Sequence, residues 1–201
     1  MKWIVGVDEV GRGPLAGPVL ICAIAMPADT YKKMKWHRHR YTLTDSKKMS
    51  RAAREYWYHE AKRMRKEGKV RYMFARRGAS TIDARGIARC VRECVDAALD
   101  RLAIAPTHCE VLLDGSLFAS KKFLLQKTII RGDSKKKIIS LASVVAKVTR
   151  DKTMDRFHFM YPDYGWNENK GYGTKVHMRG IRKTGLSPLH RRTFTRNFID
   201  G

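Results

Sequence analysis

Long apolar runs are missing from this sequence, and none approaches the roughly 18 residues that a helix needs to cross a bilayer. The N-terminal segment MKWIVGVD also reaches an acidic residue too early to hold the apolar core of a secretory signal peptide. We therefore expect a protein that is neither inserted in a membrane nor exported by that route, and that works in the cytoplasm.

Cysteine is scarce, and no two cysteines show the C-x-x-C spacing of a zinc site. Cys90 and Cys94 lie four residues apart in a segment with helical periodicity, where neither a disulfide framework nor a zinc site is expected. We interpret all of them as reduced thiols of an intracellular protein: Cys22, Cys90, Cys94 and Cys109.

Acidic residues are few as well: 19 Asp and Glu stand against 42 Lys and Arg, which gives a formal net charge of +23. This excess argues against an enzyme of neutral metabolites and predicts a polyanionic partner, because the compact chain otherwise repels itself. The length of 201 residues and the 43% hydrophobic content predict one domain with a real core.

Three basic blocks alternate with two near-neutral ones along the chain. The basic blocks are residues 31–77 (net +13), 121–169 (+6) and 170–201 (+7), and the near-neutral blocks are residues 1–30 and 78–120. The first basic block also contains Tyr31, Trp36 and Tyr41. Basic and aromatic residues together favour contact with a nucleic acid over a merely solvated surface.

Hydrophobic periodicity predicts an α/β fold with a mixed sheet. Strands are expected at residues 3–8, 19–25, 71–75, 111–113 and 123–130, with Asp114-Gly115 as the turn between the last two. Helices are expected at residues 51–67 after a Ser50 cap, at 87–102 and from 138 to about 160. Residues 161–201 show little periodicity, and we expect them to pack against the body.

Four acidic residues stand at the ends of predicted strands or beside a helix start. Asp8 and Glu9 close the first strand, Asp114 follows another, and Asp133 precedes the last long helix. Such acids can converge on one edge of a sheet, where they repel one another unless divalent cations lie between them. Mg²⁺ and Mn²⁺ prefer carboxylate oxygens, so the pattern is consistent with metal-dependent cleavage of a phosphodiester. Separate turn and capping roles are the alternative.

Asp8 and Glu9 present a geometric difficulty, because neighbours on a regular strand point to opposite faces of the sheet. Both can aim at one site only if the backbone is distorted there. Gly11 and Gly13 follow closely, and we expect them to permit such a distortion.

Residues 6–19, GVDEVGRGPLAGPV, closely resemble the opening motif of ribonuclease HII, the type 2 ribonuclease H. Further matches follow in the family's order: DSKKMS (45–50), DG (114–115), GD (132–133), ASVVAKVTRD (142–151), KGYGT (170–174), His177 and LSPLHRRTF (186–194). Arg12 in the Gly-Arg-Gly turn favours type 2 over the related type 3 enzymes.

The resemblance implies an α/β ribonuclease H-like fold, with a mixed central sheet flanked by helices. It places a catalytic domain at residues 1–160 and a substrate-contacting C-terminal region of the same domain at 161–201. It also implies an endonuclease that hydrolyses RNA paired with DNA and nicks DNA duplexes on the 5′ side of a single embedded ribonucleotide. The implied cofactor is a pair of Mg²⁺ or Mn²⁺ ions, the ends are a 5′-phosphate and a 3′-hydroxyl, and the implied roles are removal of ribonucleotides from DNA and of RNA primers.

Site residues follow from the matched motifs. The metal-binding and catalytic acids implied by the resemblance are Asp8, Glu9, Asp114 and Asp133. The implied substrate-binding residues are Gly11, Arg12, Gly13, Ser46, Lys47, Ser143, Lys147 and Tyr172. The glycine turn would sense the ribose 2′-hydroxyl through backbone groups, because glycine lets a backbone approach a sugar closely. Tyr172 would stack on the sugar of the following nucleotide.

Two histidines raise a different mechanism, in which His177 and His190 would drive attack by the ribose 2′-hydroxyl and leave a cyclic phosphate. The carboxylate cluster argues against it, and we interpret both histidines as structural. Asp151 lies four residues after Lys147 on one predicted helix, so we expect an ion pair there and not a fifth metal ligand.

Residues 31–41 are unusually basic for the family and are interpreted as an enlarged substrate-contacting loop. Little follows the Arg-Arg-Thr-Phe motif, so we expect no tail that binds a sliding clamp. A monomer is the simplest expectation for the oligomeric state. The expected partners are RNA–DNA hybrids and DNA duplexes that contain ribonucleotides, and no membrane. The rival hypothesis is a basic nucleic-acid-binding protein that kept the scaffold without catalysis, and the intact acids at all four positions argue against it.

Overall fold

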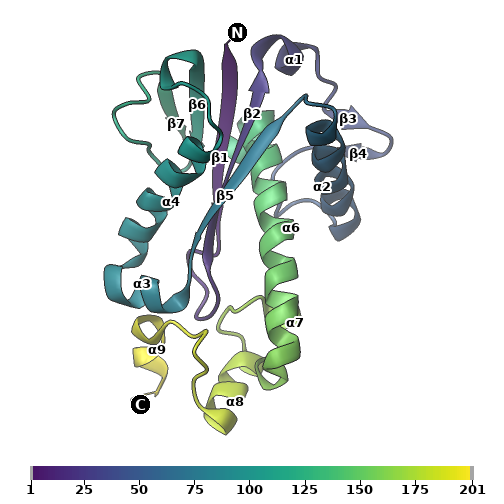
Figure 1. Cartoon of the computed structure of the whole chain (residues 1–201). Helices are drawn as coiled ribbons and strands as arrows, with labels where there is room; N and C mark the ends of the chain where they lie inside the picture. The colour runs from purple at the N-terminus through teal and green to yellow at the C-terminus, as the bar shows by residue number, and fades with distance from the viewer. Residues whose placement is uncertain (1, 200–201) are drawn as a thin grey trace.

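The computed structural model describes residues 2–199, apart from the side chains of residues 38 and 197–199. Five strands form one sheet in the order β5-β2-β1-β6-β7 (Figure 1). They are β1 (Trp3–Val10), β2 (Val19–Pro27), β5 (Arg71–Arg77), β6 (Cys109–Asp114) and β7 (Gln126–Ile129). The β1–β2 and β2–β5 pairs are antiparallel, whereas β1–β6 and β6–β7 are parallel, so the predicted α/β fold with a mixed sheet is confirmed.

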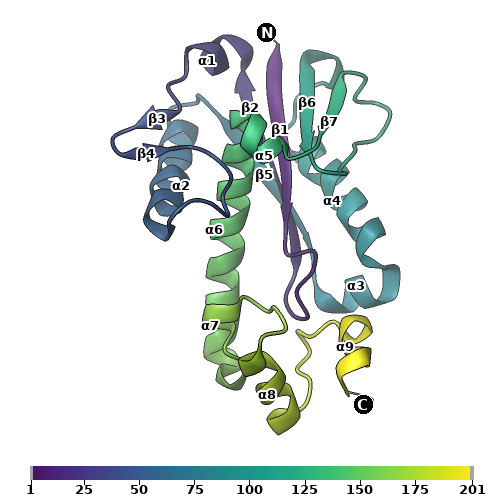
Figure 2. The same ribbon diagram turned by 180° about the vertical axis from the view of Figure 1, so that it is seen from behind.

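Helices cover both faces of this sheet. The long helix α6 (Lys137–Met160) and α2 (Arg51–Lys66) lie on one face, and α4 (Ile87–Arg101) lies on the other (Figures 1 and 2). The interior strand β2 is buried on both sides, because its odd-numbered residues pack toward α4 and its even-numbered residues toward α2 and α6. The predicted Ser50 cap is present, since the Ser50 hydroxyl accepts a hydrogen bond of 3.1 Å from the Ala53 N–H.

Gly6 lets α6 lie directly against β1. A side chain at this position would collide with the backbone of Ile138, in the first turn of α6. The start of α6 carries the short helix α5 (Gly132–Lys135) immediately before it. The missing side chain at residue 6 therefore helps to place Asp133 beside the sheet.

Short elements complete the chain. They are α1 (Ala28–Lys33), β3 (His37–Arg38), β4 (Tyr41–Thr42), α3 (Ala79–Arg85), the 3₁₀ turns η1 (Pro106–His108) and η2 (Pro162–Tyr164), α7 (Trp166–Asn169), α8 (Lys175–Thr184) and α9 (Arg192–Ile199). From the weak periodicity of residues 161–201 we expected no regular helices there, and this prediction was wrong for the described part of that segment. These helices are short. A third core cluster built around Trp166 and Tyr164 fixes α7 and α8 to α6, whereas α9 contacts α3 and its Phe194 packs against the core on the α4 side.

The connection between the last two strands also differs from the prediction. The turn was expected at Asp114-Gly115, but β6 and β7 are parallel, so the chain must cross back through residues 115–125 before β7 begins. The strand expected at residues 123–130 is therefore confined to Gln126–Ile129.

All four cysteines are buried and free, without a disulfide. Within residues 2–199, no helix is long and apolar enough to cross a membrane.

Candidate active site

A pocket of about 300 Å³ opens beside the C-terminal ends of β1 and β6. All four predicted acids line it together with six other residues: Asp8, Glu9, Val10, Ser46, Lys47, Asp114, Asp133, Ser143, Lys147 and Tyr172. The structure therefore brings together nine of the twelve residues that the sequence singled out. The other three, Gly11, Arg12 and Gly13, lie outside the lining of this pocket.

Asp8 and Asp114 share one face of the sheet because their strands are parallel and in register. The last pair between β1 and β6 is Val7↔Leu113, and both of these residues face α4. The next residue on each strand must face α6, so the two carboxylates meet on that side. Asp133 joins them from α5, where its N–H donates a hydrogen bond of 3.2 Å to Asp114 Oδ1.

Glu9 reaches the pocket without the expected backbone distortion. The antiparallel pairing of β1 with β2 continues without interruption to Val10↔Leu20, so the strand is regular at Asp8 and Glu9. β1 extends beyond its last partner on β6, which leaves its end open on that side. Adjacent residues that point to opposite faces can therefore both line one pocket. The chain leaves strand geometry only at Gly11, whose φ is +84°.

The carboxylates of this pocket lie in an environment that disfavours their charge. Burial raises the pKa of Asp8 well above its usual range, and the charges of Asp114 and Glu9 raise it further, while a hydrogen bond from Ser143 opposes the shift. Burial likewise raises the pKa of Glu9, against the influence of Arg12. The pKa of Asp133 is raised by burial, and next by the Asp114 charge. A bound cation would relieve this repulsion.

The donor set fits hard divalent cations, because it consists of carboxylates whose charges repel one another in a pocket. In the described part of the chain, no three His, Cys, Asp or Glu side chains already form a group that could hold a metal ion. Glu9 Oε1 lies 3.6 Å from the Arg12 guanidinium, and Asp114 Oδ1 accepts the Asp133 N–H. Asp8 Oδ1 accepts the Glu9 N–H at 2.7 Å, and Asp133 Oδ1 accepts the Ser134 hydroxyl at 3.4 Å. The acids are thus gathered around the pocket, and each of them is engaged with a protein group.

The hydroxyls and lysines of the pocket differ in their surroundings. Ser46 and Ser143 are both buried and their hydroxyls are 2.9 Å apart. Because Ser143 donates to Asp8, Ser46 is left to donate to Ser143, and the pair orients the carboxylate. Lys147 forms the predicted ion pair with Asp151, at 2.8 Å. The exposed Lys47 moderates the pKa shift of Asp133.

The glycine turn forms a rim beside the pocket. A side-chain Cβ built on Gly13 would lie 4.0 Å from Tyr172 Cε1, so the turn and this ring are neighbours. Tyr172 is 48% exposed, which leaves its ring free to meet a ligand. Arg12 points along the surface, with its guanidinium 3.5 Å from the Ser116 hydroxyl.

Two buried arginines hold this rim, and the sequence reasoning assigned them no role. Arg191 donates to the carbonyl oxygens of Gly11 (2.6 Å), Arg12 (2.8 Å) and Gly17 (2.9 Å). Arg150 donates to the carbonyls of Pro18, at 3.0 Å, and of Lys170, at 2.9 Å. The glycine turn and the Tyr172 loop are therefore fixed by the same pair of guanidinium groups.

These arginines are charged despite their burial. Desolvation lowers the pKa of both Arg150 and Arg191 to about 10, which still leaves them protonated at neutral pH. Both stand inside the matched motifs, but in a chain with 42 basic residues no local pattern separates a buried arginine from an exposed one. The available sequence signal was the glycines Gly11 and Gly17, which indicate a tight turn. The structure shows both at a φ of +84°, in a turn whose carbonyls the arginines hold.

The two histidines lie behind the Tyr172 loop and do not line the pocket. His177 Nδ1 is 2.9 Å from the Tyr172 carbonyl, and its Nε2 accepts from the Trp166 indole N–H at 3.0 Å. His190 Nε2 lies 3.0 Å from His177 Nε2, and its Nδ1 accepts the Ser187 N–H at 2.9 Å. Each ring nitrogen has a partner when both rings are neutral. At 0% and 2% exposure, neither ring can reach a substrate phosphate.

This arrangement predicts acid sensitivity of the fold. Burial lowers the pKa of His177, and burial together with its neighbour lowers the pKa of His190 to about 4. Below about pH 6.5 the histidines of the unfolded chain take up protons that the buried rings of the folded chain do not, so stability falls as the pH is lowered. For His190 the free energy of unfolding should drop by about 2 kcal/mol between pH 7 and pH 5. Urea denaturation at both values measures it, and the drop should shrink in His190→Asn but persist when the exposed His59 is replaced by Gln.

Comparisons with known proteins agree with this geometry. A family model described as Ribonuclease HII matches residues 5–197. The ribonuclease HII of Enterococcus faecalis (strain ATCC 700802 / V583) is 38% identical over 193 residues, which cover 96% of this chain and 69% of the relative.

Solved structures show the same fold. The ribonuclease H2 of Pyrococcus horikoshii OT3 superposes with a TM-score of 0.76 at 23% identity, covering 99% of this chain and 98% of the other. Bst-RNase HIII in complex with Mn²⁺ gives a TM-score of 0.74 at 15% identity, covering 99% of this chain and 70% of the other. With the family match over nearly its whole length, the chain belongs to the ribonuclease HII family and is a ribonuclease H, an endonuclease that acts on RNA–DNA hybrids.

Proposed function

We propose that this protein nicks DNA duplexes on the 5′ side of a single embedded ribonucleotide, as well as cleaving the RNA strand of hybrids, with two divalent cations held by Asp8, Glu9, Asp114 and Asp133. The observation that carries the proposal is the gathering of these four acids around one pocket whose rim holds the glycine turn and Tyr172. The biological roles that follow are removal of ribonucleotides from DNA and of RNA primers.

The four carboxylates would hold the cations, and Ser143 would keep Asp8 oriented toward them. When bound, Mg²⁺ or Mn²⁺ neutralises the carboxylates, makes water a better nucleophile and offsets the charge that develops on the phosphate. Attack by water on phosphorus breaks the bond to the 3′-oxygen of the preceding nucleotide. The ribonucleotide then keeps a 5′-phosphate, and the upstream strand ends in a 3′-hydroxyl.

The rim would select the ribonucleotide. The backbone of Gly11, Arg12 and Gly13 is held by Arg191, so its polar groups are positioned before a substrate arrives. Recognition of a 2′-hydroxyl by fixed backbone groups would distinguish RNA from DNA at the cut. Lys47 and Lys147 would contact the adjacent phosphates. Ser46 would contribute through its hydrogen bond to Ser143, which orients Asp8.

The region after residue 160 would belong to the same domain and contact the substrate. The third core cluster of the protein joins this region to Met154 of α6 and to Ala16 of the N-terminal loop, and Ala16 forms an isolated bridge with His190. This packing supports a C-terminal region that shapes the binding surface without forming an independent unit.

Removal of divalent metal tests the mechanism. A DNA duplex with one ribonucleotide should be nicked in Mg²⁺ or Mn²⁺, and nicking should stop when a chelator is added, because the four carboxylates then have no counter-charge. Gel analysis of end-labelled strands measures the nick and its position. Restoration of the rate by excess metal is the control, and full activity in chelator would refute the metal mechanism.

Tyr172→Ala should separate the two kinds of substrate. We expect a rate on the single embedded ribonucleotide about ten- to a hundredfold lower, since a stacking contact is worth about 1–3 kcal/mol. The rate on long hybrids should fall much less, because many positions in a hybrid can be cut. Tyr172→Phe, which keeps the ring, is the matched control. Equal losses on both substrates would contradict a role in reading the RNA-to-DNA junction.

A further inference from the structure

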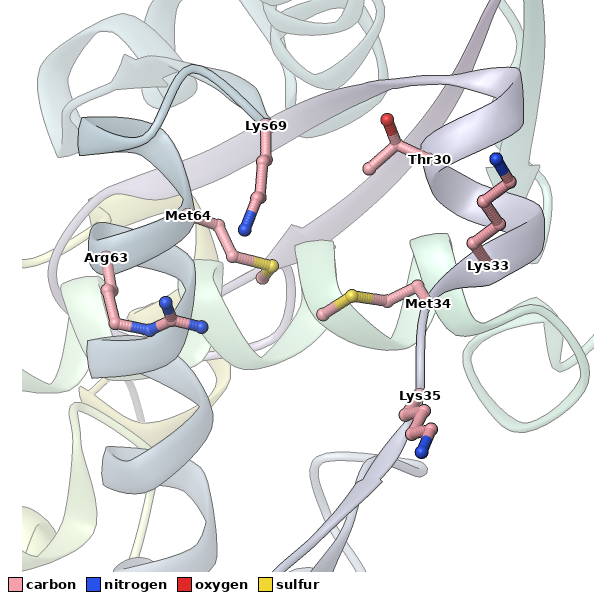
Figure 3. Close-up of a pocket in the computed structure, with 7 residues that line it drawn as sticks. All are labelled: Thr30, Lys33, Met34, Lys35, Arg63, Met64 and Lys69. Carbon is pink, nitrogen blue, oxygen red and sulfur yellow. The ribbon is translucent and has the colours of Figure 1, made fainter.

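A second pocket, of about 410 Å³, lies between α1 and the C-terminal end of α2. Its lining consists of Thr30, Lys33, Met34, Lys35, Arg63, Met64 and Lys69, so four of the seven residues are basic and none is acidic. Figure 3 shows Met34 and Met64 pointing toward one another across the pocket, with the basic side chains around them. The surface thus has an apolar floor and a positive border.

The positive charge of this border is only partly compensated. Arg63 pairs with Glu60 and Glu67, and Lys69 pairs with Glu67 at 2.7 Å. Lys33 and Lys35, by contrast, are exposed and form no ion pair with any residue that the structure describes. Among the four basic residues that line this pocket, Lys33 and Lys35 are therefore the two that remain available to an outside anion.

Aromatic contacts hold this basic segment in place. Trp36 lies between Tyr31, at 5.6 Å between ring centroids, and Trp57 of α2, at 6.4 Å. Tyr41 of the small β3–β4 hairpin packs on Tyr56 of α2 at 5.4 Å. Lys33 and Lys35 are therefore carried on a fixed surface, which lowers the entropic cost of binding a ligand there.

The pocket is displaced from the active site along α2. Ser46 and Lys47, which line the active site, come shortly before the helix, and Arg63 lies twelve residues after its first residue, Arg51. At ~1.5 Å per residue this separation along the helix is about 18 Å. A duplex rises ~3.4 Å per base pair, so an arm that ran from the cut in the direction of α2 would reach the pocket after about five base pairs.

We propose that this α1–α2 surface binds the phosphate backbone of the duplex arm on one side of the cut, through Lys33 and Lys35. The inference rests on the proposed cleavage of ribonucleotide-containing duplexes and adds a contact outside the active site. A duplex presents a regular row of phosphates, which suits two fixed lysines better than a single small anion does. The methionine floor would accept the apolar faces of the sugars.

Asymmetric duplexes test this surface. Two 30-base-pair DNA duplexes would each carry one ribonucleotide, placed three base pairs from one end or three base pairs from the other. Binding would be measured by fluorescence anisotropy in chelator, so that nothing is cut, and as a function of salt. The variant is Lys33→Gln/Lys35→Gln, which breaks no described ion pair. The control with the same change of charge is Lys121→Gln/Lys122→Gln, on the loop tied to the α4 side of the sheet. It removes the Lys122–Asp100 ion pair, which belongs to that side.

The expected result is a loss for one duplex alone. Lys33→Gln/Lys35→Gln should bind the duplex whose long arm covers the surface about tenfold more weakly at 0.1 M salt, with the log–log salt slope reduced by about two. The other duplex and the control variant should bind like wild type. Equal weakening of both duplexes, or of neither, would overturn the assignment.

The cleavage assay separates this result from the proposed function. In Mg²⁺, wild type should nick both duplexes, and at subsaturating enzyme the variant should nick the duplex whose long arm covers the surface about tenfold more slowly, in line with its weaker binding. A wild type that nicks neither duplex would contradict the proposed function. A wild type that nicks both, together with unchanged binding by the variant, would contradict only the α1–α2 surface.

Discussion

Asp8→Asn is expected to abolish nicking, with a loss on the order of 10³-fold or more, while binding of the duplex stays measurable. The substitution keeps the shape of the side chain and removes the charge that would hold a cation. In chelator the same variant should be more stable than wild type by about 1 kcal/mol, because a buried carboxylate repelled by Asp114 and Glu9 is replaced by a neutral amide. Gel assays measure nicking, and urea denaturation measures stability.

The opposite directions of these two effects are the decisive part of the prediction. A residue with a purely structural role loses activity together with stability, whereas a metal ligand that is strained without metal loses activity and gains stability. Asp100→Asn on α4 is the matched control, since Asp100 is exposed and paired with Lys122 at 2.5 Å. It should change neither property appreciably. Destabilisation by Asp8→Asn would contradict the interpretation of Asp8 as a repelled ligand.

Of the substitutions considered, Arg191→Met is expected to lower the free energy of unfolding most, by about 3–5 kcal/mol. The side chain is fully buried, and its donors reach the carbonyls of Gly11, Arg12 and Gly17. Methionine fills similar space but leaves these carbonyls without those donors. For a chain of this size the melting temperature should fall by about 10 °C, measured by differential scanning fluorimetry.

The next residue along the chain provides the control for Arg191. Arg192 is exposed, and its bond to Asp83 at 2.8 Å comes from its backbone N–H, so Arg192→Met removes the same positive charge without removing that bond. Its melting temperature should stay within about 2 °C of wild type. Similar losses for the two variants would show that net charge, and not the hydrogen bonds to the glycine turn, sets the effect.

The acidic part of the site was predictable because it depends on local rules. Asp8 and Asp114 each end an apolar strand, and the parallel register of β1 and β6 then brings them to one face. The long elements were found for the same reason: α2 and α4 each show an apolar stripe over many residues, and the first half of α6 is a long run of buried residues. Periodicity of this kind reports burial directly.

The remaining features depend on contacts that no short segment reveals. The parallel pairing of β7 depends on its contact with β6, and α7 and α8 are stabilised by a cluster around Trp166 and not by their own length. The expected distortion at Glu9 was wrong because the open end of β1 removes the need for it. The roles of Arg150 and Arg191 appear only when distant carbonyls are placed around them.

The hydrogen bond from Arg191 to Gly11 joins residues 180 positions apart. During synthesis the N-terminal strands can begin to pair while the glycine turn still lacks this partner, because Arg191 is added long after them. The surface that would recognise a ribose therefore matures after the sheet does. A nascent chain could form its N-terminal strands before it could select a cutting point, since the turn is held only once Arg191 has been added.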